Sequence, residues 1–182
     1  HTITDLKAFA QFSGASSDTF GSSPFALDVD VDAKDPTKYA LSVDHAGLGM
    51  PDRDNYLKPE FASKKAAYQA YVTKLLTLVH WADPAKSAAD IVAFETEIAK
   101  VHWARTELRD PDKTYNPMTV EALVKSVPSF DWMTWLRASG VPEAGLAQRI
   151  VIVGEPSAIK AEADLIAKTD LNTLRAGQAF HK

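Results

Sequence analysis

The chain has 182 residues, of which 46% are hydrophobic and 24% are charged, as expected for a folded globular domain. Its 20 basic and 24 acidic residues give a net charge of -4, which argues against nucleic acid as the main partner because phosphate binding needs a concentrated basic surface. The sequence has no cysteine, which excludes disulfides and thiolate chemistry, and no apolar run approaches the roughly 20 residues that span a bilayer.

The first part of the chain predicts a short helix followed by a β-hairpin. Apolar residues at near-helical spacing lie between Thr2 and Phe12, and turn-forming residues fill the stretch 14–24. Over residues 25–32 apolar side chains alternate with aspartates, and the same alternation resumes after a turn. This pattern is typical of half-buried strands and predicts a hairpin over about 25–44.

The rest of the chain has mainly helical periodicity. Apolar spacings of three, four and seven predict helices over about 59–80, 84–109, 119–126, 130–139, 156–168 and 170–182. The β-branched run 149–153 predicts a lone strand, and the last helix has no terminator before Lys182, which indicates a truncated chain. The predicted fold class is therefore mainly α with one small β-hairpin, in a single domain or lobe.

The sequence predicts no catalytic residue and no metal site in this chain. The histidines are isolated from one another, and no two have the spacing that places both on one helix face around a zinc ion. No nucleophile elbow or phosphate-binding loop occurs. We interpret His102 as a polar flank of an amphipathic helix.

Two further patterns have structural interpretations. The run 28–32 resembles the opening of a calcium loop, but Ala33 stands where a glycine is needed and Tyr39 where a bidentate Glu belongs. We interpret these carboxylates as a solvated strand face and keep calcium binding as a lesser alternative. The tryptophans are interpreted as core residues rather than as the lining of a site. They are Trp81, Trp103, Trp132 and Trp135.

Three motifs, taken in order, carry a family resemblance. They are GLGMPDRDNY at 47–56, RDPDKTYNPMT at 109–119, and FDW at 130–132 followed by VGEP at 153–156. In this order and at these separations the chain resembles the N-terminal half of the neprilysin-type zinc metalloendopeptidases, the family of neprilysin, endothelin-converting enzyme and bacterial oligopeptidase O. The resemblance extends from about Phe20 to the end.

The resemblance implies a specific role. Enzymes of this family have two mainly helical lobes around a cavity that admits peptides, and their zinc motif lies in the other, C-terminal lobe. This chain would therefore be a fragment of the capping lobe, which binds no zinc itself and depends on zinc in the parent enzyme. Its implied partners are the rest of the parent chain and peptide substrates, and its implied location is extracytoplasmic.

The matched residues divide into two groups. Structural roles, as anchors of loops and helix ends, are expected for Arg53, Asp54, Asp110, Tyr115 and Asn116. A functional alternative places three side chains on the cavity wall, in contact with substrate: Trp103, Arg105 and Arg109. A second hypothesis for the whole chain is a free-standing helical interaction module without catalysis.

Overall fold

The computed structural model describes residues 3–16 and 23–181. The helices are α1 (Leu6–Ala15), α2 (Asp54–Leu57), α3 (Ala62–Leu78), α4 (Pro84–Val101), α5 (Arg105–Leu108), α6 (Val120–Ser126), α7 (Trp132–Ala138), α8 (Pro156–Lys168) and α9 (Leu171–His181), with short 3-10 turns at Pro59–Phe61 and Leu146–Gln148. The strands are β1 (Phe25–Asp32), β2 (Asp35–His45), β3 (Asn116–Thr119) and β4 (Ile150–Val153). The fold is mainly α with a small β element, as the sequence predicts.

The four strands form one mixed sheet in the order β1-β2-β4-β3. The β1–β2 hairpin is antiparallel, with Phe25 opposite His45. Strand β4 pairs in parallel with β2, where Leu41 faces Val151, and antiparallel with β3. Pro117 lies in β3, at the edge of the sheet, where its missing N–H costs no ladder hydrogen bond.

The prediction of a lone strand at 149–153 is wrong. Residues 150–153 form β4, an inner strand with a partner on each side, and Val151 and Val153 are buried. The partner strand β2 is more than 100 residues away in the sequence, so no local pattern announces the pairing.

The predicted helix 84–109 is too long at its C-terminal end. Helix α4 ends at Val101 because His102 has an extended backbone (φ -63°, ψ 144°), and the short helix α5 follows as a separate element. The apolar spacing that reaches Leu108 continues the helical period by coincidence, since the His102 ring turns away to a buried partner on α8.

Several helix starts agree with the capping residues in the sequence. Thr119 Oγ1 accepts a hydrogen bond from the backbone N–H of Ala122 at 3.1 Å at the start of α6, and an Asp131 carboxylate oxygen accepts one from Thr134 at 3.0 Å at the start of α7. Pro156 occupies the first turn of α8, where its lack of an N–H is harmless.

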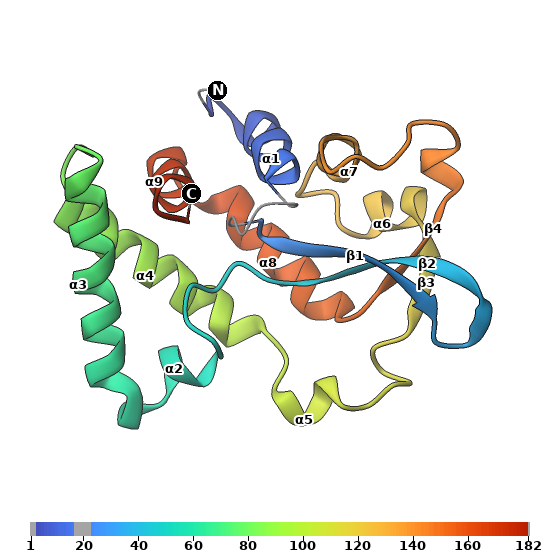
Figure 1. Ribbon diagram of the computed structural model, residues 1–182, viewed down its shortest axis with the longest axis horizontal. Helices are drawn as coiled ribbons and strands as arrows, with labels where there is room; N and C mark the ends of the chain where they lie inside the picture. Colours follow the sequence, from blue (N-terminus) through green and yellow to red (C-terminus); the bar gives the residue numbers. More distant parts are fainter. Residues whose placement is uncertain (1–2, 17–22, 182) are drawn as a thin grey trace.

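Among the described residues, three groups of buried side chains hold these elements together. The largest surrounds the sheet, where Phe25 packs on Trp132 with ring centroids 4.6 Å apart, and Trp135 is also fully buried. A second lies between α3, α4 and α9 and includes Leu76 and Ile91. The third comprises Met50, Tyr56 and Ala99, where the segment after β2 packs on α4. Helix α8 contacts both α4 and β2, and Figure 1 shows it crossing between the α3–α4 pair and the sheet.

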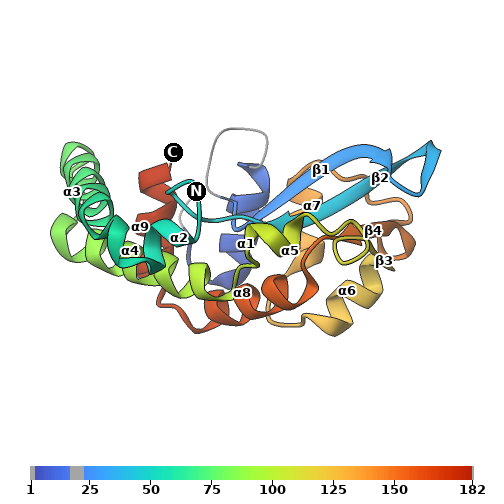
Figure 2. The same ribbon diagram turned by 90° about the horizontal axis from the view of Figure 1, so that it is seen from below.

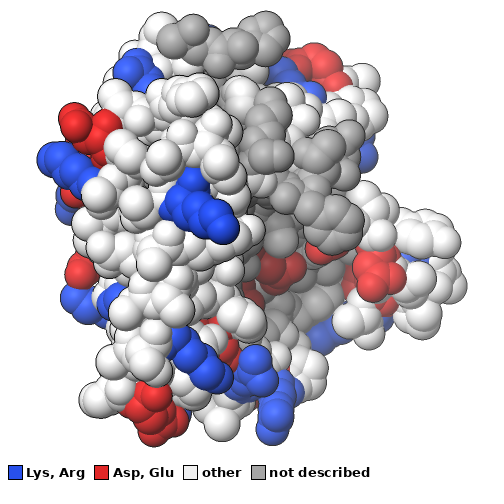
Figure 3. All heavy atoms as spheres, turned by 60° about the vertical axis from the view of Figure 1, so that its left-hand side comes forward, with Lys and Arg blue, Asp and Glu red and all other residues white. Residues whose placement is uncertain are grey.

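The surface is mixed in charge. On the face in Figure 3, the described basic and acidic side chains are interspersed among uncharged ones, which agrees with the small net charge of -4. Among the helices within residues 3–16 and 23–181, none is long and apolar enough to cross a membrane.

Candidate functional site

An open cavity of about 460 Å³ lies between the glycine-containing loop after β2 and the segment that follows α4. We call it the loop cavity. Its lining residues are His45, Ala46, Gly47, Leu48, Gly49, Met50, Pro51, Asp52, Arg53, His102, Trp103, Arg105 and Leu108. The C-terminal end of α4 lies between α2 and α5 in both ribbon views, so motifs about 50 residues apart meet here (Figures 1 and 2).

Two arginines from different segments contribute positive charge to the loop cavity. Arg53 Nε donates a hydrogen bond to the carbonyl oxygen of Ala99 at 3.0 Å, which ties the loop to the last turn of α4. Arg105 Nε donates to Asp52 Oδ2 at 2.5 Å, and the Asp54 backbone N–H, with a further contribution from Arg105, holds the Asp52 pKa below its usual value. Within the described part of the chain, Arg53 has no ion pair with a carboxylate.

Two imidazoles are stacked at the inner end of the loop cavity. The rings of His45 and His102 lie 3.7 Å apart, and His102 Nε2 lies 2.9 Å from Glu162 Oε2, with both partners buried. Burial lowers the pKa of His102 to about 3 and raises the pKa of Glu162 well above its usual range. Burial thus favours the uncharged form of each partner, and the 2.9 Å contact between them is a hydrogen bond.

This position contradicts the interpretation of His102 as a solvated helix flank. The side chain is 3% exposed, and its partner lies 60 residues away on α8. The His102 ring therefore joins the end of α4 to α8 instead of facing water.

Further carboxyl groups surround the stacked rings. The backbone N–H of His45 donates to Glu155 Oε2 at 3.1 Å. Burial, with a further contribution from Glu155, raises the pKa of Asp44 to about 6. Gly47 has a positive φ of 79°, and a Cβ there would lie 3.0 Å from Glu162 Oε1, so glycine suits this position both conformationally and sterically.

A second buried polar group, the Glu95 cluster, explains the motif at 47–56. Glu95 is buried and accepts hydrogen bonds from the hydroxyls of Tyr56 at 2.8 Å and Tyr68 at 3.0 Å. The Tyr56 hydroxyl in turn accepts from the backbone N–H of Met50 at 2.9 Å. A Cβ on Gly49 would lie 1.8 Å from the Tyr68 oxygen, so only glycine allows this close approach.

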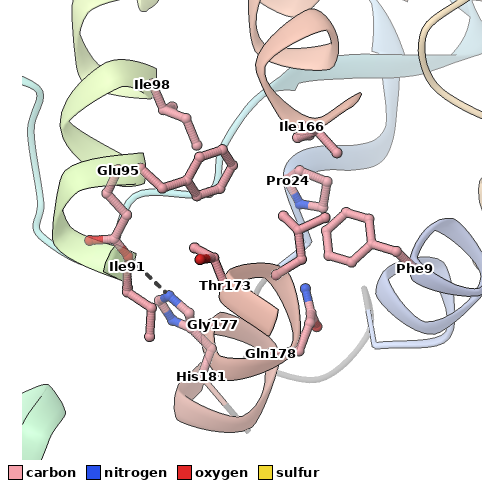
Figure 4. A pocket seen from close by; sticks show the side chains of 13 residues that line it. Phe9, Pro24, Ile91, Glu95, Ile98, Ile166, Thr173, Gly177, Gln178 and His181 are labelled. Atoms are coloured by element: carbon pink, nitrogen blue, oxygen red, sulfur yellow. Dashed lines mark hydrogen bonds and ion pairs between the residues drawn. The ribbon is translucent and has the colours of Figure 1, made fainter. Parts of the chain in front are cut away.

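Beside the Glu95 cluster is a small, mainly apolar pocket of about 40 Å³. Figure 4 shows the His181 ring directed at Glu95, to which its Nε2 lies at 3.3 Å, while Phe9, Pro24 and Ile166 lie on the opposite side. The volume is far below the roughly 300–1,000 Å³ that is typical of small-molecule sites.

Two of the three residues predicted to line a cavity line the loop cavity, and the third does not. Trp103 and Arg105 both line the loop cavity, and Trp103 Nε1 donates to Ser157 Oγ at 2.8 Å. Arg109 is exposed and is not among the residues that line it.

The residues expected to be structural anchors mostly contact nearby backbone or one distant partner. Asp54 pairs with Lys58 at 2.8 Å within its own turn, so of these two anchors it is Arg53 that ties the loop to α4. Asp110 accepts hydrogen bonds from the backbone N–H groups of Asp112 and Lys113, which shapes the turn after α5.

The remaining two anchors join the 110–116 segment to the sheet. The Tyr115 hydroxyl donates to Asp32 at 2.9 Å, next to the hairpin turn. Asn116 Nδ2 donates to the carbonyl oxygens of Lys113 at 2.7 Å and Val153 at 3.0 Å.

The described residues do not supply a zinc site. Nowhere in residues 3–16 and 23–181 do three or more His, Asp or Glu side chains gather in an arrangement that could hold a metal ion.

Sequence reasoning missed His45, Glu95 and Glu162 as members of buried polar groups. Each has partners 27 or more residues away, and a single sequence gives no signal for such a contact. The buried position of Glu95 on an apolar helix face was the one available hint, because an unpaired carboxylate there would be costly.

Comparison with known proteins agrees with this geometry. Residues 2–181 match the N-terminal region of peptidase family M13. The chain superposes on the zinc metalloprotease Zmp1 of Mycobacterium tuberculosis in its open state with a TM-score of 0.92 and 28% identity, over 99% of this chain and 28% of that one.

Curated relatives agree as well. Endothelin-converting enzyme 1 of Rattus norvegicus is 28% identical over 80% of this chain and 20% of its own length. The endothelin-converting enzyme homolog of Locusta migratoria is 32% identical over 59% of this chain and 15% of its own length. The chain thus spans about a fifth or less of these relatives. The match over residues 2–181 and the shared fold place the chain in peptidase family M13, the neprilysin-type metallopeptidases, as the motifs predict.

Proposed function

We propose that this chain is a capping-lobe segment of a zinc-dependent endopeptidase that hydrolyses small peptides in an enclosed cavity. The observation that carries the proposal is the superposition of 99% of the chain on a zinc metalloprotease with a TM-score of 0.92. The zinc, the catalytic residues and the general base belong to the rest of the parent chain, and the location of the parent is extracytoplasmic.

The chain's own contribution is shape. The Glu95 cluster joins α2, α3, α4 and α9, while the His102–Glu162 pair joins α4 to α8. Because these contacts are buried and hydrogen-bonded, the elements around the loop cavity are held in one arrangement. Such a wall restricts access to peptides and excludes folded proteins.

Hydrolysis of a fluorogenic peptide tests the proposal. The full-length product of the reading frame should cleave the peptide, lose activity with a chelator and regain it with zinc, whereas the 182-residue chain alone should cleave nothing. Chelator-sensitive cleavage by the purified chain would overturn the proposal, and so would a reading frame without a zinc motif downstream.

The alternative, a free-standing helical interaction module, is favoured by exposed apolar side chains on the hairpin. Val29 is 68% exposed and Tyr39 is 78% exposed. This alternative requires that the gene encode no catalytic half and that the chain bind a partner through the hairpin. Loss of that binding in Tyr39→Ser would support it, and an inert hairpin would exclude it.

A further inference from the structure

We propose that the loop cavity binds the carboxylate of a peptide, held by Arg53 and Arg105 beside the indole of Trp103. The choice of a peptide as ligand rests on the proposed function. The anion site itself rests on the contacts around Arg53.

Arg53 forms no ion pair within the described residues, although its charge, after larger effects of the Asp54 N–H and Arg105, helps to lower the pKa of Asp52. Its Nε bond to Ala99 fixes the guanidinium, and its two terminal nitrogens remain for other acceptors. Its charge contributes to lowering the pKa of both His45 and His102, after the larger effect of burial, so it lies close to both rings. A half-buried arginine that shares the single carboxylate of the cavity lining with a second arginine favours a further anion.

The other polar groups of the loop cavity leave it with a net positive charge. Asp52 is the only carboxylate among the lining residues, and Arg105 pairs with it. Arg53 therefore remains as the excess charge. The Nε2 atom of His45, a lining residue at the inner end, is buried and has no hydrogen-bond partner.

The rest of the lining suits an amino-acid residue attached to the carboxylate. The Trp103 ring is held by its bond to Ser157, and Leu48, Met50 and Leu108 add apolar surface. A cavity of about 460 Å³ is larger than a bare anion needs, so it can also hold the residue that carries the carboxylate. Inorganic phosphate would leave these apolar side chains without contacts.

Binding of matched peptides to this chain tests the proposal. The probes are N-acetyl-trialanine as free acid, the same peptide as amide, and N-acetyl-Ala-Ala-Asp-amide, with inorganic phosphate as competitor. The measurement is the shift of the Trp103 indole N–H signal in NMR titrations, with the signal assigned through Trp103→Phe. Hydrolysis is not involved, so the outcome is independent of the test of the proposed function.

We expect at least one carboxylate peptide to shift the Trp103 signal saturably and to bind about tenfold more tightly than the neutral amide. The two acidic peptides distinguish a C-terminal from a side-chain carboxylate. Arg105→Gln, at an exposed side chain that tolerates change, should weaken binding about tenfold. Arg53→Lys should also weaken it, while Arg149→Gln, an exposed arginine outside the loop cavity, should not.

Equal binding of acid and amide, or unchanged affinity in a folded Arg105→Gln variant, would overturn the proposal. Phosphate binding as tight as that of the peptides, with the same arginine dependence, would overturn the assignment to a peptide ligand.

Discussion

The Glu95 cluster makes a quantitative prediction for Tyr56→Phe. The substitution keeps the ring, which is 5% exposed, and removes only the hydroxyl. That oxygen donates to Glu95 at 2.8 Å and accepts from the Met50 N–H at 2.9 Å, so both partners lose a bond without gaining access to water. Burial raises the pKa of Tyr56, which keeps the hydroxyl protonated as a donor at all pH values of interest.

The expected loss follows from these two bonds. A hydrogen bond to a charged group contributes about 1.5–3 kcal/mol and a neutral one about 1 kcal/mol. Relaxation of the neighbouring Tyr68 toward Glu95 offsets part of this, so the free energy of unfolding should fall by about 2–4 kcal/mol. For a chain of this length the melting temperature should fall by about 2–4 °C per kcal/mol.

Urea unfolding followed by circular dichroism measures this loss, with Tyr71→Phe as the matched control. Tyr71 is 54% exposed and lies on α3 near the same cluster, so its variant should stay within about 0.5 kcal/mol of the parent chain. A loss below 0.5 kcal/mol for Tyr56→Phe, equal to that of the control, would refute the cluster as a stabilising network.

Three further substitutions test other parts of the fold. Gly49→Ala should destabilise the chain by about 3–5 kcal/mol in the same urea assay, because its Cβ displaces the Tyr68 hydroxyl, and a loss under 1 kcal/mol would contradict the close approach. The pKa of Asp44 is raised to about 6, mainly by burial and further by Glu155. Ionisation of this carboxyl as the pH rises from about 4 to 6 therefore lowers the free energy of unfolding. Asp44→Asn should therefore gain about 1–2 kcal/mol relative to the parent chain between pH 4 and pH 7, after allowance for solvent screening, and a pH-independent difference would contradict this. Trp132→Ala should cost about 3–5 kcal/mol, and retention of the parent melting temperature would show that the aromatic core is wrongly placed.

The sequence predicts those features of the fold that depend on local pattern. The alternation over 25–32 and the apolar spacings within 119–126 and 130–139 each act over a few residues, and a strand and two helices form in these segments. Helix α4 starts at Pro84 as predicted. Its end depends on the contact between His102 and α8, which the apolar spacing of the sequence does not reveal.

The candidate site was less accessible to sequence reasoning for the same physical reason. Arg53 could be recognised as an anchor from its motif, and its bond to α4 agrees with that role. The stacking of His45 on His102 and the burial of Glu162 arise from segments more than 50 residues apart. Spacing rules that search one helix face for paired histidines do not detect them.

The measurement that tests the central claim most directly is the zinc content of two purified proteins, this chain and the full-length product of its reading frame. The account predicts stoichiometric zinc in the full-length product and none above background in the chain, since the described residues supply no group that could hold it. Stoichiometric zinc in the chain alone, or none in an active full-length product, would contradict the assignment of this chain to the capping lobe of a zinc endopeptidase.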